Sequence, residues 1–360
     1  MWRRAAERVG RMTLLTRGAT LPDPGSSALR LHSLGTGGAV AARAALLRWW
    51  HAERPAADLL HDSQGFMLPL FAALGRGGPL RLTSDFTSTY DWHAHLRGQH
   101  AVEWRVRELR YWLQTAEARA LGRLADAFTV FGEGHRAPFA RFARVGVEQV
   151  HSIPNCVDPE GFSPDGPRAD LGLDPGDPVL LFVGQPFRYK GIHELLEAVA
   201  ALTPRFPRVR LLLVGSAPGG AEAIVRERVA ALGLGAHVQL AGPRPRAELP
   251  GLMRAADVVV LPSYTEGSPR VLIEAMACAR PIVGTDLPGI ATLDPAGTCI
   301  RRVARADAPA LAEALAATLA DPGAAAEAGR RGRERFLRFH TPDAAGDALA
   351  ALYQRLVPGR

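Results

Sequence analysis

The chain has 360 residues, of which 47% are hydrophobic and 22% charged, and its formal net charge is +7 at pH 7. This length suits two α/β domains with a core each, and the composition is typical of a soluble globular protein. No apolar run reaches the ~18 to 20 residues of a membrane-spanning helix, and we expect no secretory signal. Three widely spaced cysteines, Cys156, Cys278 and Cys299, form neither a disulfide framework nor a zinc pattern, which favours a reducing cytoplasm.

The positive charge comes almost entirely from arginines, which are spread along the chain among Asp and Glu. A patch for nucleic acid is the weaker interpretation of this spread, so we expect no nucleic-acid partner. A basic protein also favours anionic lipid surfaces or phosphorylated substrates, which leaves a peripheral membrane contact open. We therefore expect the protein in the cytoplasm, either free or at the inner face of the membrane.

Strand-like and helix-like runs alternate along the chain, a pattern that predicts parallel sheets joined by crossover helices. In the first half, the helix expected at 92–124 has apolar residues at helical spacing, which indicates a face that packs on a core. The other helices of this half are expected at 38–52, 66–75 and 135–144. Strands are expected at the sequences RMTLLT, LRLHSL, ADLLHDS, LRLTSDF, AFTVFGE and VHSIP.

A stretch rich in Pro, Gly and Asp, IPNCVDPEGFSPDGPRADLGLDPGDP, is typical of an interdomain linker, and a second doubly wound pattern starts after it. The sequence thus predicts a domain over 1–165, a second domain over 166–340, and a final helix over 341–360 that packs back on the first domain. The strands of the second domain are expected at 179–183, 209–214, 237–241, 257–261 and 281–284, and its helices at 192–202, 219–232, 246–255, 269–278 and beyond 307.

Lys190 is the only lysine among the 43 Lys and Arg residues of the chain. In an open parallel sheet, ligands bind beyond the carboxyl ends of the strands, where loops lead into helices. Gly184 ends a predicted strand there, and Lys190 comes directly before Gly191 at the start of a helix. An ammonium, free backbone N–H groups and a helix dipole together favour an anion site. A solvated surface lysine is the alternative, and the single use of lysine favours the anion site.

The stretch LLLVGSAPGG repeats this arrangement, with Gly215 at a strand end and Gly219 and Gly220 at a helix start. Taken alone the pattern is weak, because any tight turn between a strand and a helix gives similar glycines. We assign Gly215 to the candidate site because its strand ends at the same edge of the predicted sheet.

The segment LPSYTEGSPRVLIEAMACARPIVGTD is the most informative one. Ser268 is predicted as the N-cap of a helix and Pro269 as its first residue. The N–H groups of Arg270 and Val271 would then lack partners inside the helix, which makes its amino-terminal end a place for an anion.

Two carboxylates bracket this helix end, Glu266 in the preceding loop and Glu274 on the helix. A diphosphate held on the N–H groups would leave Glu274 to accept hydrogen bonds from sugar hydroxyls, as acidic residues do for riboses elsewhere. Gly267 permits a close approach of a backbone or a ligand. The alternative, a surface ion pair between Arg270 and Glu274, explains Glu274 and leaves Glu266 and Gly267 unexplained.

The sequence resembles the retaining nucleotide-sugar glycosyltransferases of family 4, whose architecture of two Rossmann-like domains facing a cleft is called GT-B. IPNCVDPEGFSP is similar to the interdomain IPNGVD…F.P of that family, FVGQPFRYKG to its GR….KG, and EGSPRVLIEAMACARPIVGTDLPGI to its E-x7-E segment. The resemblance covers nearly the whole chain. A lone KG would be poor evidence, but three motifs in this order and spacing are specific.

By this resemblance, Lys190 binds the donor diphosphate, Glu274 holds the nucleotide ribose, and Glu266 contacts the transferred hexose with help from the backbone of 267–271. The implied reaction moves a hexose from a UDP- or GDP-linked donor to an acceptor hydroxyl, with retention at the anomeric carbon. The acceptor would be a sugar or a lipid-linked sugar of a cell-envelope glycan or exopolysaccharide. Fixed N–H dipoles and cations can stabilise a departing nucleoside diphosphate, so no metal and no cofactor are expected, and the chain has no D-x-D motif.

Several positions depart from the pattern of the family. Gln185 stands where the family has Arg, and Arg188 is a candidate to supply that charge from another backbone position. Ser84 stands where a catalytic His is expected, which leaves Asp85 as the candidate catalytic residue of the first domain. Beyond Gly289, IATL replaces the expected Pro-Glu. The glycosyltransferase is the leading hypothesis. Gln185, Ser84 and the missing first unit described below motivate an alternative, a non-catalytic nucleotide-sugar-binding protein or a partner subunit of an active transferase; an epimerase on the same scaffold is less favoured.

The first residues, WRRAAERVGRMTLLT, resemble the end of the first helix of the family and its second strand. We therefore expect the amino-terminal domain to lack its first βα unit, of ~25 to 30 residues, and its sheet to lack a central strand. The acceptor is expected in this domain, where Trp92, Trp104 and Trp112 could form a lipid-facing or sugar-stacking surface, with ordinary packing as the alternative.

Base recognition is expected near LAGPRPRAEL, residues 240–249, although nothing there separates UDP from GDP. His61, Asp62 and His151 are interpreted as structural. The GTGG at 35–38 is a possible substitute for the missing Gly-rich loop and is more typical of a turn.

Overall fold

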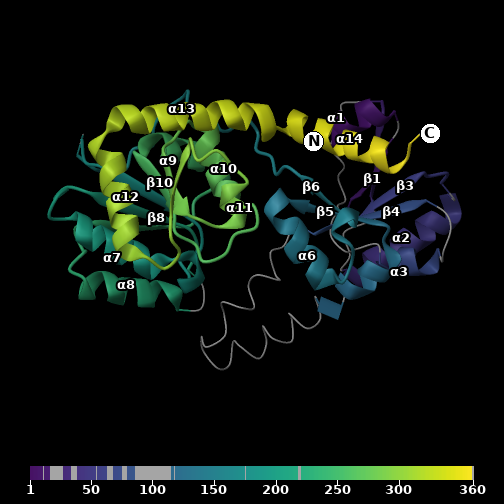
Figure 1. Cartoon of the computed structure of the whole chain (residues 1–360), viewed down its shortest axis with the longest axis horizontal. Coiled ribbons are helices and arrows are strands. Elements are labelled where there is room, and N and C mark those ends of the chain that lie inside the picture. The colour runs from purple at the N-terminus through teal and green to yellow at the C-terminus, as the bar shows by residue number, and fades with distance from the viewer. Residues whose placement is uncertain are drawn as a thin grey trace. The chain divides into compact units, whose positions relative to one another are not determined.

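The structure is a computed structural model that describes residues 1–10, 12–16, 27–33, 39–53, 55–62, 68–74, 79–85, 115–116, 118–174, 176–217 and 220–358. These residues form two compact units, each with its own core (Figure 1). Unit 1 contains Met1–Asn155 and Pro342–Arg360, and unit 2 contains Cys156–Thr341. The sequence-based boundary at 165 therefore differs from that of the structure. The reason is that Val157 and Phe162, in the Pro- and Gly-rich stretch, are buried in the core of unit 2.

Unit 2 is a parallel sheet of six strands in the order β12-β11-β10-β7-β8-β9. Its strands are β7 (Val179–Val183), β8 (Arg210–Val214), β9 (Val238–Gly242), β10 (Val258–Leu261), β11 (Ile282–Thr285) and β12 (Ile300–Val303). Its helices are α7 (Ile192–Leu202), α8 (Ala221–Ala231), α9 (Leu249–Ala255), α10 (Arg270–Ala277), α11 (Pro288–Ala291), α12 (Ala308–Ala320) and α13 (Pro322–Phe339). The predicted doubly wound α/β domain is confirmed, and α11 and β12 are elements that the sequence analysis did not predict.

The central strands of unit 2 are almost entirely apolar because both faces of the sheet are covered; Arg210, the first residue of β8, is the exception in β7, β8 and β10. All four residues of β10 are buried, and so are most residues of β7 and β8. Helix α7 packs against α12 on one side, and α10 packs against α13 on the other (Figure 1). The covered middle of the sheet is therefore a largely apolar core.

Unit 1 contains two parallel sheets among its described residues. One pairs β1 (Met12–Thr16) with β2 (Leu29–Ser33), and the other has the order β3 (Leu59–Asp62), β4 (Leu80–Asp85), β5 (Ala127–Phe131), β6 (Val150–Ile153). No pairing joins β1 to β3 in the part of the chain that the structure describes. The expectation that the sheet of this domain lacks a central strand stays a prediction.

The helices of unit 1 are α1 (Trp2–Val9), α2 (Ala39–Glu53), α3 (Leu68–Ala73), α6 (Arg136–Ala143) and α14 (Pro342–Leu356). Helix α14 packs against α1 and β6, and Asp347 on α14 forms ion pairs with Arg4 and Arg8 of α1. Most of the helix expected at 92–124, with Trp92, Trp104 and Trp112, lies outside the described residues, as does the GTGG at 35–38. Among the described residues, no helix is both long and apolar enough to cross a bilayer.

Asp294 fixes the entry into β12, the edge strand of unit 2. Its side chain is buried and accepts hydrogen bonds from the backbone N–H groups of Cys299 and Ile300, at 2.7 Å and 2.8 Å. Burial alone would raise the pKa of this carboxyl, but these hydrogen bonds together with that from Thr298 outweigh burial and hold the pKa below its ordinary value.

We expect Asp294→Ala to lower the free energy of unfolding by roughly 2 to 4 kcal/mol, because it leaves two buried N–H groups without an acceptor. Because the folded-state pKa is depressed, the stability that the ionised carboxyl contributes is complete above the unfolded-state pKa of about 4 and is lost as the pH falls through the folded-state pKa. Urea unfolding of wild type, Asp294→Ala and Asp294→Asn between pH 7 and pH 3 measures both effects. The control is Asp286→Asn, whose side chain is 63% exposed; an equal loss in the control would contradict the assignment.

Candidate active site

The predicted glycines at the strand ends of unit 2 lie together at the carboxyl edge of its sheet. The N–H of Gly184, after β7, donates to the carbonyl of Val214 at 2.8 Å, and the N–H of Gly215, after β8, donates to that of Gly242 at 2.9 Å. A Cβ on Gly215 would overlap the carbonyl oxygen of Gly184, so the loops after β7 and β8 are in direct backbone contact. Gln185 continues this contact, with its side-chain amide 3.5 Å from the hydroxyl of Ser216.

The loop after β7 also presses against the loop after β10. Gly191 is the left-handed residue, at φ 71°, between the 3₁₀ helix η3 (Arg188–Lys190) and α7. A Cβ on Gly191 would overlap the carbonyl oxygen of Pro262, which follows β10, and the N–H of Tyr264 donates to the carbonyl of Tyr189 at 2.8 Å. A side chain at 191 would overlap the carbonyl of Pro262 and would strain a left-handed backbone. These two reasons explain why glycine follows the lysine.

This contact brings Lys190 to Glu266. The ammonium of Lys190 lies 2.7 Å from Oε1 of Glu266, and the hydroxyl of Ser263 donates to the same oxygen at 2.6 Å. The two charged side chains are only 22% and 9% exposed, so the pair is largely screened from solvent. Thr285, at the end of β11, donates to the backbone carbonyl of Ser263 at 2.6 Å and so fixes the loop that carries the carboxylate.

Arg188, the candidate substitute for the arginine replaced by Gln185, is exposed and lies near His193 and Tyr264, at the start of α7. Its charge acts on His193 and Tyr264. The hydroxyl of Tyr264 donates to Glu194 at 2.5 Å, and burial together with Glu194 raises the pKa of this tyrosine to about 12. The contacts of the described residues thus associate Arg188 with the start of α7 and give it no contact with Glu266.

The start of α10 lies one residue later than predicted. Pro269 occupies the cap position and Arg270 is the first helical residue, so Ser268 is not the N-cap and no side chain caps this end. The loop ending in Gly267 is held from outside, because a Cβ on Gly289 would overlap the backbone oxygens of Glu266 and Gly267. Gly289 therefore has a positioning role that the sequence analysis did not predict.

Glu274 is buried on α10, with a side chain only 4% exposed, and two arginines reach its Oε1. Arg246, in the 3₁₀ helix η4 (Arg246–Glu248), places Nη1 at 2.8 Å, and Arg270 places Nε at 3.5 Å. Burial raises the pKa of this carboxyl, and the charges of Arg246 and Arg270 oppose the increase. The ion pair considered from the sequence, Arg270–Glu274, does form, but Arg246 is closer and was not singled out.

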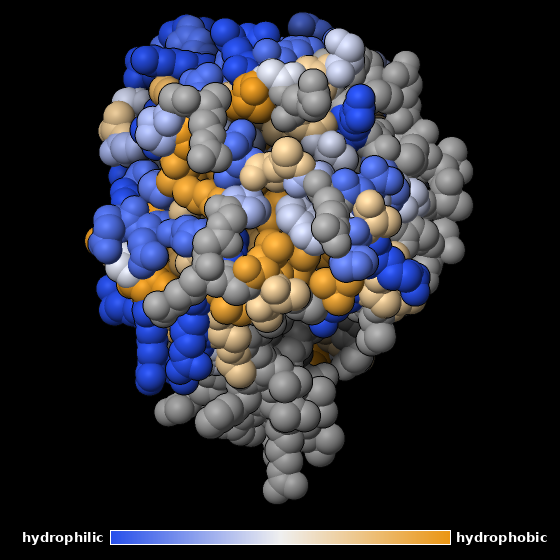
Figure 2. Space-filling model, turned by 90° about the vertical axis from the view of Figure 1, so that its right-hand side faces the viewer, coloured by the Kyte–Doolittle hydropathy of each residue, from blue (hydrophilic) through white to orange (hydrophobic). Residues whose placement is uncertain are grey.

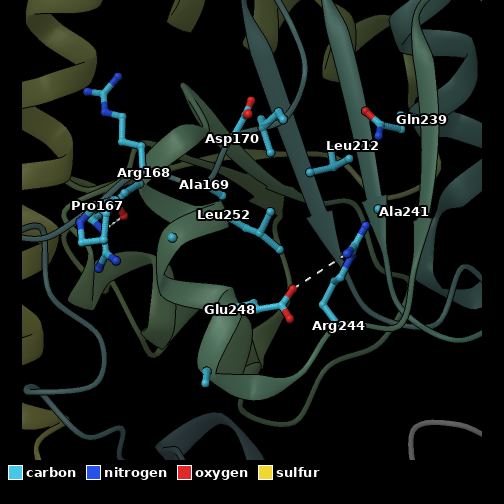
Figure 3. Close-up of a pocket in the computed structure, with 14 residues that line it drawn as sticks. Pro167, Arg168, Ala169, Asp170, Leu212, Gln239, Ala241, Arg244, Glu248 and Leu252 are labelled. Atoms are coloured by element: carbon cyan, nitrogen blue, oxygen red, sulfur yellow. Dashed lines mark hydrogen bonds and ion pairs between the residues drawn. The ribbon is translucent and has the colours of Figure 1, made fainter.

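A cavity of about 320 Å³ lies beside part of the stretch expected to recognise the base (Figure 3). Ala241, Arg244 and Glu248 line it, and the last two form an ion pair with Nη1 3.8 Å from Oε2. Leu212 and Leu252 are among its apolar lining residues, and the others include the 167–171 segment. None of the predicted phosphate- and sugar-binding residues lines this cavity, so the base expectation stays a prediction.

In unit 1, Asp85 ends β4, and its side chain lies outside the described part. Ser84, at the place of the expected catalytic His, is buried and engaged on both sides. Its hydroxyl lies 2.5 Å from Nε2 of His61 and 2.5 Å from the hydroxyl of Thr129, and Nδ1 of His61 lies 2.6 Å from the hydroxyl of Tyr353 on α14. Burial lowers the pKa of His61 to about 3, so the imidazole is neutral. This chain of hydroxyls and imidazole joins β3, β4, β5 and α14, in agreement with a structural role for His61.

Comparison with known proteins gives a family and a fold. Residues 167–335 match the family described as "Glycosyl transferases group 1". The D-inositol 3-phosphate glycosyltransferase of Corynebacterium jeikeium is 33% identical over 220 residues, which are 58% of this chain and 52% of that protein. That of Segniliparus rotundus is 35% identical over 223 residues, 59% of this chain and 48% of that protein. The chain thus spans about half the length of the curated relatives it matches.

Solved structures extend the likeness over both units. A sucrose-phosphate synthase from Thermosynechococcus elongatus aligns with a TM-score of 0.76 and 25% identity, over 98% of this chain and 92% of that one. HepE of Anabaena, solved in complex with UDP, aligns with a TM-score of 0.70 and 20% identity, over 91% of this chain and 86% of that one. These matches confirm the GT-B expectation, and unit 2 belongs to the group 1 glycosyltransferases, as the resemblance to family 4 implies.

Proposed function

We propose that the protein is a retaining glycosyltransferase that moves a hexose from a nucleotide-diphosphate sugar to an acceptor hydroxyl. One observation carries the proposal: the contact between the β7 and β10 loops places the ammonium of Lys190, the only lysine in the sequence, against Glu266, in the loop that leads into α10. A cation, an acidic side chain and a helix amino terminus are the groups that a diphosphate joined to a sugar needs.

In this proposal the donor rearranges an ion pair that exists before it binds. The diphosphate accepts hydrogen bonds from the first N–H groups of α10 and draws the ammonium of Lys190 from Glu266. Glu266 is thereby released to accept hydrogen bonds from the hexose. As the glycosidic bond to the diphosphate breaks, negative charge grows on the leaving phosphate, and the fixed dipoles and the ammonium stabilise it. Glu274 accepts hydrogen bonds from the ribose.

The relatives and solved neighbours suggest which donor base and which acceptor to assay first. Solved neighbours carry UDP and UDP-glucose, and the curated relatives are named for D-inositol 3-phosphate. We propose UDP-linked hexose as the first donor to test and GDP-linked hexose as the second, with D-inositol 3-phosphate and lipid-linked sugars as acceptors. A non-catalytic nucleotide-sugar binder is the second candidate, favoured by Gln185 and by the buried, engaged hydroxyl of Ser84.

We expect Lys190→Ala to reduce kcat/KM for UDP-hexose by about 10² to 10³-fold, because it removes a cation from the developing charge of the leaving group. Nucleotide release measured for wild type and mutant gives the value, with Arg226→Gln on the exposed surface of α8 as a control expected to match wild type. Full activity in Lys190→Ala would exclude the role of the ammonium. Tight UDP or GDP binding by the wild type without turnover on any acceptor would favour the second candidate.

We propose that the transferase needs no metal, because Lys190 and the N–H groups of α10 supply the positive charge. Turnover by protein treated with EDTA is expected to equal that of untreated protein, in the same nucleotide-release assay. A loss of turnover in EDTA that Mg²⁺ or Mn²⁺ restores would contradict this.

We also propose a peripheral contact of unit 1 with the inner face of an anionic membrane, in the cytoplasm. On α2, Leu47 is 36% exposed and is followed by the exposed Arg48 and by the half-buried Trp49 and Trp50. The view onto this side of unit 1 shows apolar residues among hydrophilic ones (Figure 2). Aromatic, aliphatic and basic side chains on one helix are typical of contacts with the interface of a bilayer.

Sedimentation with vesicles tests this contact. We expect the protein to bind vesicles that contain phosphatidylglycerol more tightly than vesicles of pure phosphatidylcholine, because the anionic lipid attracts Arg48. Arg48→Glu should weaken the binding, whereas Arg226→Glu on α8 should leave it unchanged. Equal binding to both vesicle types, or an equal effect of the two substitutions, would exclude α2 as the contact.

A further inference from the structure

The carboxylate of Glu274 is held from one side only. Arg246 and Arg270 both contact Oε1, and no ion pair or hydrogen bond to Oε2 is found among the residues that the structure describes. A carboxylate oxygen accepts about two hydrogen bonds, so Oε2 retains its full capacity for a ligand. This asymmetry separates the two oxygens into a fixed one and an available one.

Arg246 is itself positioned by the segment that opens unit 2. Its guanidinium lies over the ring of Phe162, 5.0 Å from the centroid, a distance at which a cation is attracted to an aromatic face. Phe162 is buried, and its carbonyl accepts a hydrogen bond at 3.1 Å from Arg333, which also donates to the carbonyl of Ala277 at the end of α10. The ring under Arg246 and the helix that carries Glu274 are therefore fixed to the same arginine of α13.

The charge of Arg246 matters because Glu274 is buried. A buried carboxyl tends to be protonated, and a protonated group would offer the ribose a weaker acceptor. Around Glu274, the charged and titratable groups are Arg246 on η4, Arg270 on α10 and Cys278, the residue after α10; Arg333 of α13 contacts the carbonyl of Ala277. Arg246 makes the shorter of the two ion pairs, and of the two arginines it alone is stacked on an aromatic ring among the described residues.

We propose that Arg246 is a positioning residue for donor binding: stacked on Phe162, it holds Oε1 of Glu274 so that Oε2 faces the ribose hydroxyls of the nucleotide. The inference rests on the proposed function, since it assumes a nucleotide at α10. By this proposal, Phe162 of the interdomain motif supports the guanidinium of Arg246. Arg246 acts through Glu274 and does not itself contact the reacting atoms.

The test is calorimetric titration of UDP and of GDP into the full chain between pH 5 and pH 8. Donor binding requires ionised Glu274, so it is present above the pKa of this carboxyl and is lost as the pH falls through it. Arg246→Gln removes a charge that opposes protonation. The midpoint of the acid loss should therefore rise by about one pH unit, and the affinity for the preferred nucleotide at pH 6 should fall about tenfold.

Two further variants separate positioning from general damage. Arg246→Lys keeps the positive charge and should return most of the midpoint shift, and Phe162→Leu should produce a smaller shift in the same direction because the charge loses its support. Arg226→Gln, on the surface of α8, should match wild type in affinity and midpoint. Thermal unfolding of each variant checks that unit 2 remains folded.

The outcomes distinguish the inference from the proposed function. An unchanged affinity and midpoint in Arg246→Gln would overturn the inference while wild-type binding still supports the proposed function. A loss of affinity on Arg246→Gln that is just as large in a protein that also carries Glu274→Gln would also overturn it, because Arg246 would then act independently of Glu274. Wild-type protein that binds neither UDP nor GDP would remove the proposed function, and the inference with it.

Discussion

The contact between the loop after β7 and the loop after β10 is the constraint on which the candidate site depends. β7 and β10 are neighbours in the sheet, so their carboxyl ends lie side by side, but hydrogen bonding between the strands does not by itself bring their loops together. Gly191 does so, because its missing Cβ leaves room for the carbonyl of Pro262. The ion pair of Lys190 with Glu266 follows from this approach. A change that separates the two backbones would therefore remove the pair without altering either charged residue.

Much of unit 2 could be predicted from the sequence because its strands are buried on both faces. Such strands read as short apolar runs, and the glycines and prolines between them mark their ends. β12 escaped prediction because Arg301 and Arg302 interrupt its apolar pattern, as an edge strand allows. What fixes its start is Asp294, whose hydrogen bonds reach five and six residues along the chain, to Cys299 and Ile300. Local patterns do not record bonds of that kind.

The site was predictable where a residue type is rare and hidden where it is common. Lys190 is the only lysine of the chain, so the sequence alone distinguishes it. Arg246 is one of many arginines, and nothing in the sequence around it distinguishes it. Its role appears only when the fold places it over Phe162 and against Glu274. Gly289 was likewise missed, because its function lies in what its missing Cβ permits on another loop. These residues could not be predicted because the groups that they contact lie far away in the sequence.

The two carboxylates of the E-x7-E segment share one arrangement, which is compatible with an ammonium at position 190 in a chain that otherwise uses arginine. Each carboxylate is held at Oε1: that of Glu266 by Lys190 and Ser263, and that of Glu274 by two arginines that approach the same oxygen. A guanidinium at 190 would present a planar fork, which can engage both oxygens of a carboxylate. An ammonium is a compact point charge and engages one. At Glu274 the arginines reach one oxygen only because each presents a single nitrogen. At Glu266, the ammonium of Lys190 contacts Oε1 alone, and no ion pair or hydrogen bond to Oε2 is found among the described residues; the proposed function assigns this second oxygen to a sugar hydroxyl.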